Sequence, residues 1–187
     1  MSDEKLISAL REIDKKLKGL KWVVFSGLAV KIYANPEREI NDIDIIIPNW
    51  KEFCEASKRF GKEFTETFKE KENFTTKDYG HFELNIKGTE VEMTAGLWEM
   101  KFGNIISKPS FDEEWISHVK EKEFNGLKLN VQPLEDLIVQ KIAMYREKDK
   151  KDLEYLLAKL KEVDMNFLKK DAKNWNFLEK VTSLLKL

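Results

Sequence analysis

The sequence predicts a mixed α/β (α+β) fold in which a short mixed β-sheet flanked by helices is followed by a C-terminal helical region. Strand-like and helix-like segments alternate up to about residue 131, and apolar positions after Pro133 recur only at helical spacing. Hydrophobic residues make up 42% of the 187 residues, with 12 Phe and 5 Trp, which is enough to bury a core. We therefore expect an α/β core over residues 1–131 and helices over 132–187 that pack on it.

Local patterns define the elements of the first part. Leu6, Leu10 and Ile13 repeat at helical spacing, and Asn49 and Gly61 flank a segment as its N-cap and C-cap. The elements predicted in this part are a helix ending near Gly19, a strand over 21–25, a short helix over 28–34, a strand over 42–47 and a helix over 50–60.

Turn residues define the second part. Lys87-Gly88 and Asn125-Gly126 each supply a two-residue turn, which predicts two antiparallel hairpins. Residues 62–80 are less regular and are expected to hold a strand and a mobile loop. The other predicted elements are hairpins over 81–95 and 122–131 and helices over 111–122, 133–148, 150–163, 165–175 and 176–187.

Charge and cysteine content exclude several classes of protein. Charged residues are 36% of the chain, but the net charge is only −1, which argues against a basic protein that coats nucleic acid. Cys54 is the only cysteine, so no intrachain disulfide framework can form. The sequence has neither a signal-peptide pattern nor a run of about 18 apolar residues. We expect a soluble cytoplasmic protein without a membrane span. Glutamine is scarce, with only Gln132 and Gln140.

Two carboxylates lie at the start of the most apolar predicted strand. Residues two apart in a strand point to the same face, so Asp42 and Asp44 project together while Ile43 and Ile45 face the core. Carboxylates this close repel each other, and a divalent cation between them removes that cost. Magnesium binds through one or two carboxylates together with substrate phosphates. This pattern predicts a site for Mg²⁺ or Mn²⁺.

A third acid is expected on the hairpin over 81–95. If its second strand lies beside the strand of Asp42, Glu92 joins the two aspartates on one face, and Glu90 is the alternative. Ser26 and Gly27 supply the complementary half of the site. A strand that turns into a helix there directs free backbone N–H groups at a phosphate, and the Ser26 hydroxyl can also donate.

The order strand, Ser-Gly, helix, Asp-x-Asp strand and acid-bearing hairpin resembles the DNA polymerase β-type nucleotidyltransferase superfamily. The similarity is greatest to its minimal prokaryotic members, including AbiEii-like proteins, and it covers roughly residues 20–160. The segment "QKIAMYREKDKKDLEYL" resembles a helix of those families with its Lys141, Arg146, Lys151 and Asp152. This sequence departs from the usual motif at Ser26, where the family usually has glycine.

The resemblance implies a Mg-dependent nucleotidyltransferase that moves an NMP from an NTP, such as ATP, to an acceptor and releases pyrophosphate. It implies Asp42, Asp44 and Glu92 as catalytic metal ligands, and Ser26, Gly27, Lys141 and Arg146 as nucleotide contacts. The acceptor stays open between tRNA, a protein and a small molecule, and a role in a toxin–antitoxin system is one option. Alternatively, Arg146 and Asp152 form an ion pair that fixes the helices.

Two other functions and two alternatives for single features accompany this interpretation. A catalytically silent nucleotide- or partner-binding protein, such as an antitoxin or regulator, would have the same fold. A metal-dependent phosphohydrolase would need a His-Asp cluster, which the sequence lacks. His81 is the first residue of the hairpin and is either a substrate contact or a polar histidine at a strand edge. The lysines of the C-terminal helices form either a solvated face or a surface for tRNA.

Overall fold

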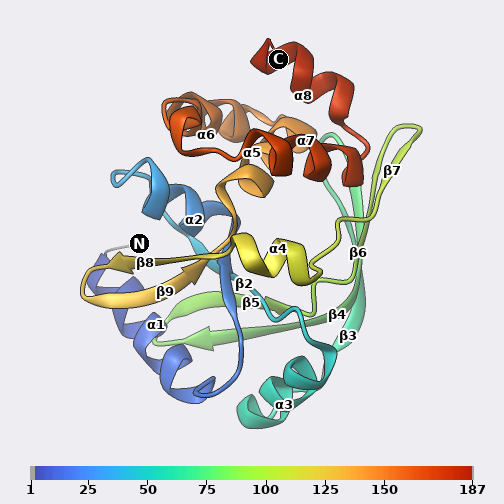
Figure 1. Ribbon diagram of the computed structural model, residues 1–187. Helices are drawn as coiled ribbons and strands as arrows, with labels where there is room; N and C mark the ends of the chain where they lie inside the picture. The colour runs from blue at the N-terminus through green and yellow to red at the C-terminus, as the bar shows by residue number, and fades with distance from the viewer. Residues whose placement is uncertain (1–2, 187) are drawn as a thin grey trace.

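A mixed sheet of nine strands organises residues 3–186, the part of the chain that the computed structural model describes (Figure 1). Its strands run in the order β7-β6-β4-β5-β2-β1-β9-β8, and β3 pairs with β4 outside this path. The strands are β1 (Val23–Phe25), β2 (Asp42–Ile46), β3 (Thr65–Glu70), β4 (Thr75–Ile86), β5 (Thr89–Thr94), β6 (Trp98–Phe102), β7 (Ile105–Ser107), β8 (Lys120–Phe124) and β9 (Leu127–Val131). The carboxylate-bearing strand β2 therefore lies inside the sheet, between β1 and β5.

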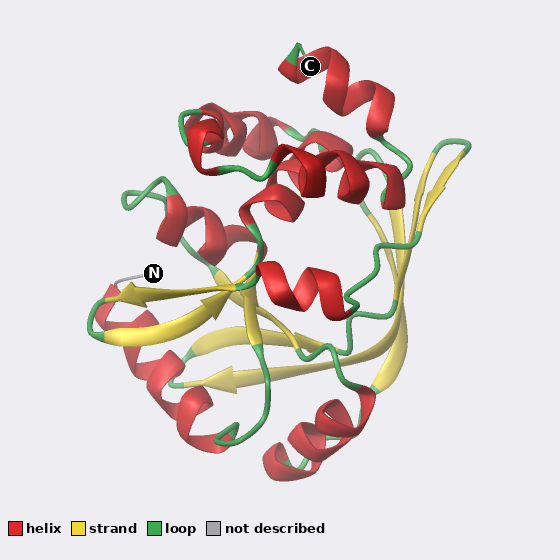
Figure 2. Cartoon of the chain, viewed as in Figure 1, coloured by secondary structure: helices red, strands yellow, loops and turns green. Residues whose placement is uncertain are grey.

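Helices cover both faces of the sheet. Ile43 and Ile45 of β2 share the larger core with the apolar side of α1, whereas Phe25 faces the other side, where Trp115 of α4 is buried. The helices that follow β9 gather at one end of the molecule (Figure 2). The helices are α1 (Asp3–Lys16), α2 (Ser26–Tyr33), α3 (Trp50–Phe60), α4 (Glu113–His118), α5 (Leu134–Met144), α6 (Glu147–Leu157), α7 (Met165–Asn174) and α8 (Leu178–Leu185).

The predicted caps and turns are confirmed. The Asn49 side chain accepts hydrogen bonds from the backbone N–H groups of residues 51 and 52, and Gly61 ends α3 with a φ of 63°. Asn125 and Gly126 have φ angles of 48° and 78°, the two-residue turn expected between β8 and β9. The mixed α/β fold class is also confirmed.

Three predicted helices extend too far, and the one over 150–163 ends at Leu157 and begins earlier, at Glu147. The helix over 111–122 ends at His118, because Lys120–Phe124 pairs with β9 as a strand. The helix over 133–148 ends at Met144, where Tyr145 takes a left-handed φ of 49°. The Asp149 carboxylate accepts a hydrogen bond from the backbone N–H of Arg146, so a new helix, α6, begins there. This break turns Arg146 away from the α5 axis.

The middle of the chain holds more strand than predicted. A strand and a mobile loop were expected over residues 62–80, but β3 and the first part of β4 form an antiparallel hairpin there. Residues 81–86, predicted as a strand, are the second part of β4, and β6 and β7 form another hairpin that the sequence did not predict. Buried residues from both sides of the predicted boundary at 131/132 share the larger core, and that boundary stays a prediction. Over residues 3–186, no helix combines the length and the apolar character that crossing a bilayer requires.

Candidate active site

Parallel pairing of β2 and β5 brings the predicted acids together. The register sets Asp42 opposite Glu90 and Asp44 opposite Glu92, so all four carboxylates share one face of the sheet. Asp44 and Glu92 are half-buried and line a cavity, whereas Glu90 is exposed and lies outside it. Burial and the cavity lining therefore separate the two candidates for the third acid, and Glu92 is the one that lines the cavity with the aspartates.

The environment of Asp44 disfavours its charged form. Burial is the main cause that raises the pKa of the Asp44 carboxyl to about 7, and the charges of Asp42 and Glu92 add to it. The Lys141 ammonium and the Ser26 hydroxyl act in the opposite direction. A cation bound at these carboxylates would remove the repulsion that raises this pKa.

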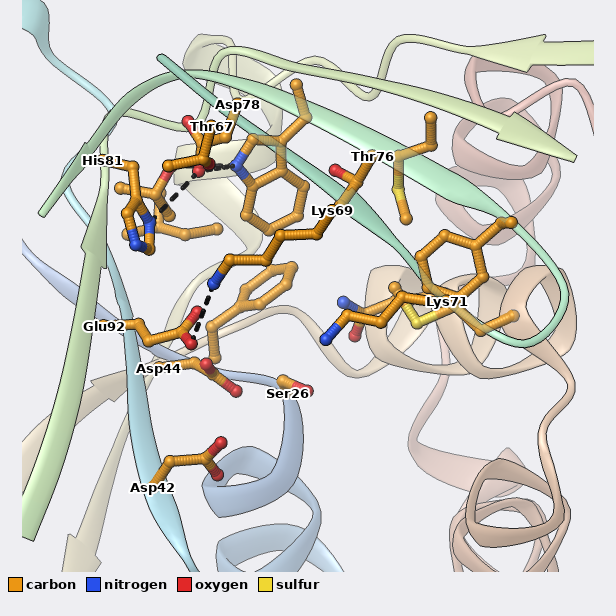
Figure 3. Close-up of a pocket in the computed structure, with 18 of the residues that line it drawn as sticks. Ser26, Asp42, Asp44, Thr67, Lys69, Lys71, Thr76, Asp78, His81 and Glu92 are labelled. Atoms are coloured by element: carbon orange, nitrogen blue, oxygen red, sulfur yellow. Dashed lines mark hydrogen bonds and ion pairs between the residues drawn. The ribbon is translucent and has the colours of Figure 1, made fainter. Parts of the chain in front are cut away.

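Ser26 begins α2 in a conformation that favours glycine. Its φ is 55°, in the left-handed region where a Cβ atom meets the following carbonyl oxygen. This explains why a glycine is usual at this position in the superfamily that the sequence resembles. The backbone N–H of Ser26 donates to Gln132 Oε1 at 2.9 Å, and the residue lines the cavity beside Asp44 (Figure 3).

Gly27 is packed against an arginine. A Cβ atom at Gly27 would lie 2.6 Å from Nη1 of Arg38, so a larger residue would displace that side chain. Arg38 is held in place by Asp152, whose two carboxylate oxygens accept from Nε at 2.7 Å and from Nη2 at 3.2 Å. The resemblance implied that Gly27 lets a phosphate approach, but the close neighbour in this structure is the Arg38 guanidinium.

The cavity has an acidic wall and a basic wall. The acids lie on β2 and β5, and the facing lysines Lys69 and Lys71 project from β3 and the turn after it (Figure 3). Arg146 and Lys148 add positive charge from the junction of α5 and α6. Other residues that line the cavity are Phe25, Ile45, Ile46, Thr67, Phe74, Thr76, Asp78, His81, Thr94, Trp98, Met100, Gln140 and Met144.

Lys69 bridges the two sides of the cavity. Its Nζ lies 3.1 Å from Glu92 Oε1 and 3.4 Å from Glu83 Oε1 (Figure 3 shows the bond to Glu92). Burial opposes the charged ammonium, but the hydrogen bonds to Glu92 and Glu83 outweigh it and raise the pKa of Lys69. Also among the basic residues of the cavity, burial and the neighbouring Arg146 charge lower the pKa of Lys148.

Lys141 does not reach the cavity surface as a nucleotide contact would. Its side chain is 1% exposed, and Nζ lies 3.1 Å from Asp149 Oδ1 and 2.9 Å from Asp152 Oδ2. Arg146, which does line the cavity, donates to Asp149 through Nε at 2.6 Å. The ion pair expected between Arg146 and Asp152 is therefore wrong, because each of these residues has a different partner.

His81 lines the cavity beyond Glu92. It is 5% exposed, and Nε2 lies 3.1 Å from Glu83 Oε1 while Nδ1 lies 3.7 Å from Asp78 Oδ2. Burial opposes protonation, but the contacts with Asp78 and Glu83 outweigh it and raise the pKa of His81. The histidine therefore faces the site, and both of its ring nitrogens lie near carboxylates. This position is compatible with the first of the two interpretations of His81, a substrate contact.

Sequence reasoning missed the basic wall. Thr67, Lys69 and Lys71 are spaced two apart, which is the period of one strand face, so the alternation was present in "TFKEK". The segment offered no turn signal, and nothing local indicated that its face meets the Asp-x-Asp strand. Asp149 was also missed, because its role depends on the helix break at Tyr145.

The aspartates suit a divalent cation that arrives with a substrate rather than a closed metal centre. Among residues 3–186, no group of three His, Cys, Asp or Glu side chains is arranged to hold a metal ion, and Lys69 engages Glu92. Asp42 and Asp44 still provide two hard oxygen ligands on one strand face, the set that Mg²⁺ uses together with substrate phosphates.

The fold of the chain is similar to that of solved structures. The chain resembles the solution structure of the antibiotic-resistance factor ANT(2'')-Ia, with a TM-score of 0.58 and 13% identity, over 98% of this chain and 96% of that one. It also resembles the crystal structure of ANT(2'')-Ia in complex with adenylyl-2''-tobramycin, with a TM-score of 0.54 and 11% identity, over 94% of this chain and 98% of that one. At these identities the likeness shows the fold, which is that of nucleotidyltransferases.

Family membership follows from the sequence as a whole. The chain belongs to DUF2204, described as a nucleotidyl transferase family of unknown function, whose model matches residues 2–186. A search of curated proteins finds no match to the sequence. The predicted superfamily is therefore confirmed, and the protein is a nucleotidyltransferase.

Proposed function

We propose that the protein transfers an NMP from an NTP to a hydroxyl or phosphate of an acceptor and releases pyrophosphate. The observation that carries this proposal is the opposition of two walls, with carboxylates on β2 and β5 facing lysines and an arginine. An acidic wall alone would repel a triphosphate, and a basic wall alone would bind anions without positioning a metal. Their combination suits a nucleotide that arrives with a divalent cation.

Each wall has a distinct role in this proposal. Asp42 and Asp44 would hold Mg²⁺ or Mn²⁺, which when bound supplies Lewis-acid activation and neutralises phosphate charge. Glu92, once free of Lys69, accepts the proton of the acceptor hydroxyl. The Ser26 hydroxyl and the backbone N–H groups that follow Ser26 in the first turn of α2 bind phosphate oxygens. Arg146 stabilises the charge that builds on the leaving pyrophosphate.

Charge arithmetic supports the need for a cation. The cavity is lined by four acids and four basic residues, so it is close to neutral before a nucleotide binds; these are Asp42, Asp44, Asp78, Glu92, Lys69, Lys71, Arg146 and Lys148. An NTP adds several negative charges, which would be unbalanced next to Asp42 and Asp44. One or more divalent cations bound with the nucleotide restore the balance.

The central test is transfer of label from each α-labelled NTP in the presence of Mg²⁺. Separate reactions contain total tRNA, a protein extract or an aminoglycoside, the last because the related fold of ANT(2'')-Ia was solved with adenylyl-2''-tobramycin. We expect one labelled acceptor and its loss in the Asp42→Ala/Asp44→Ala variant. Equal transfer by that variant, or no labelled product in any reaction, would contradict the assignment.

A matched pair of glutamates tests the site model. Glu92→Gln is expected to reduce the transfer rate by about 10²–10⁴-fold, the range typical for loss of a general base. Glu90→Gln, two residues away on the same face but outside the cavity, is the control and should keep nearly full activity. Equal losses in the two variants would show that a place in the cavity does not select the third acid.

The biological setting belongs to the same proposal. The sequence resemblance to AbiEii-like proteins favours a toxin of a toxin–antitoxin system that acts in the cytoplasm and modifies tRNA or a protein. A small adjacent gene whose product blocks the transfer reaction would support this. Growth that is unaffected by overexpression of the active enzyme would argue for a metabolic acceptor instead.

A further inference from the structure

Gln132 lies behind the active site, and both polar atoms of its side chain have hydrogen-bond partners. Its side chain is completely buried at the junction of β9 and α5 and is not among the residues that line the cavity. The Oε1 atom accepts from the backbone N–H of Ser26 at 2.9 Å, and Nε2 donates to Asp136 Oδ2 at 2.6 Å. The same Nε2 lies 3.4 Å from Oε1 of Gln140, the other glutamine of the chain.

The donor and acceptor groups around Gln132 allow only one orientation of its side-chain amide. A backbone N–H can only donate, so Ser26 requires the carbonyl oxygen of the Gln132 amide. The Asp136 carboxylate accepts, so it requires the amide nitrogen, and it also accepts from Trp175 Nε1 at 3.0 Å. The buried acid thereby fixes which end of the Gln132 amide faces the start of α2.

The backbone of Gln132 is tied to the same region. Its N–H donates to the Val24 carbonyl at 2.9 Å, and its own carbonyl accepts from the Tyr33 hydroxyl at 2.9 Å. Gln132 therefore contacts the strand before Ser26, Ser26 itself and the last turn of α2. Because its contacts lie at both ends of this short helix, Gln132 can hold α2 at a fixed position.

We propose that Gln132 is a positioning residue of the nucleotide site, which keeps Ser26 in its left-handed conformation and so aims the Ser26 hydroxyl and the start of α2 into the cavity. This proposal rests on the proposed function, because it assumes that Ser26 contacts the phosphates. A strained non-glycine conformation persists only where the surrounding structure over-determines it, and Ser26 has a φ of 55°. Gln132 supplies that constraint without touching substrate.

The test measures nucleotide binding in a double-mutant cycle of Gln132→Leu and Ser26→Gly, with a non-hydrolysable NTP analogue and Mg²⁺. With Ser26 in place, Gln132→Leu is expected to weaken binding about tenfold, since it leaves a backbone donor without its partner. In the Ser26→Gly background the loss is expected to be about threefold or less, because glycine adopts the left-handed conformation without support. Equal losses in both backgrounds would overturn the proposal.

Two further measurements separate positioning from folding. Hydrogen exchange of the Ser26 amide, followed by NMR, should accelerate in Gln132→Leu while the amides of α3 stay as protected as in the wild type. Asp136→Asn, which keeps the shape but removes the charge that orients the amide, should shift binding in the same direction by a smaller factor. Faster exchange at Ser26 with unchanged nucleotide affinity would overturn the proposal.

The matched control is Asp171→Asn. Asp171 is 2% exposed beside Asp136, and an asparagine there still offers a donor to the Asp136 carboxylate, so nucleotide affinity should stay within about twofold of the wild type. If the wild-type protein binds no NTP analogue, the proposed function fails. If the wild type binds the analogue and Gln132→Leu binds it equally well, only the role of Gln132 fails.

Discussion

Substitution of Ser26 by glycine and by alanine measures what the left-handed backbone costs. Both variants lose the hydroxyl, and both keep the backbone N–H that donates to Gln132, so their difference isolates the conformational term. Alanine in the left-handed region costs roughly 1–2 kcal/mol. The greater freedom of glycine in the unfolded chain offsets about 0.5–1 kcal/mol of that advantage. Ser26→Gly should therefore be more stable than Ser26→Ala by about 0.5–1 kcal/mol.

Thermal unfolding provides the assay. For a chain of 187 residues, that free-energy difference corresponds to a Tm about 1–4 °C higher for Ser26→Gly than for Ser26→Ala. Urea unfolding should give the same order with equal m-values, because neither substitution changes the surface exposed on unfolding.

The same pair of substitutions at Ser8 is the control. Ser8 lies inside α1, where the φ is ordinary and glycine is the less stable choice by roughly 1 kcal/mol. The order of stability should therefore be reversed at Ser8. A Ser26→Ala variant that melts at or above Ser26→Gly would refute the conformational cost assigned to Ser26.

Three other substitutions test the buried charges. Lys141→Met should lower the free energy of unfolding by about 3 kcal/mol. This value is at the low end of the range for breaking a buried ion pair, because both aspartates that contact Lys141 also contact arginines. The control is Lys151→Met, which removes an exposed lysine and should change urea stability little. Burial and the Asp136 charge raise the pKa of Asp171 from 3.8 to about 10. Between these two pH values the native state binds a proton that the unfolded state lacks. The stability of the wild type therefore falls as pH rises through that range. Asp171→Asn has no proton to lose at this position. Urea unfolding at several pH values should therefore show the variant gaining stability relative to the wild type by up to about 1.4 kcal/mol per pH unit. A stability difference that is constant with pH would contradict the assignment of the proton to Asp171. Gly27→Ala should weaken nucleotide binding more in the wild type than in an Arg38→Ala background, which lacks the guanidinium atoms nearest to the added Cβ. Purely additive effects would argue against that contact.

Local chemistry made part of the site predictable. The alternation of Asp42, Ile43, Asp44 and Ile45 gives a two-faced strand whatever surrounds it, and the structure has that pattern. The Lys87-Gly88 turn fixed a hairpin whose second strand carries Glu92. These features depend on neighbours in sequence, so they could be inferred from the residues alone.

The rest depends on contacts between distant segments. Lys69 belongs to the site only because β3 pairs with β4, and no local signal states which strand a segment will join. The ion pair that buries Lys141 follows from the break at Tyr145, since in a continuous helix Asp149 would lie about 12 Å along the axis from Lys141. Gln132 carried no motif, and its scarcity as a residue type did not reveal its contact with Ser26.

The charged residues around Lys141 also explain why a fully buried lysine can matter to a nucleotide site that it does not line. Arg38, Asp152, Lys141, Asp149 and Arg146 contact one another in that order, with positive and negative charges alternating. One end of this chain packs on Gly27 at the start of α2, and the other end lines the cavity. Lys141 sits at its centre, so its removal would release both aspartates that hold the arginines. We infer that the lysine implied by the family resemblance fixes the distance between the start of α2 and Arg146, the two groups to which the proposed function assigns phosphate contacts.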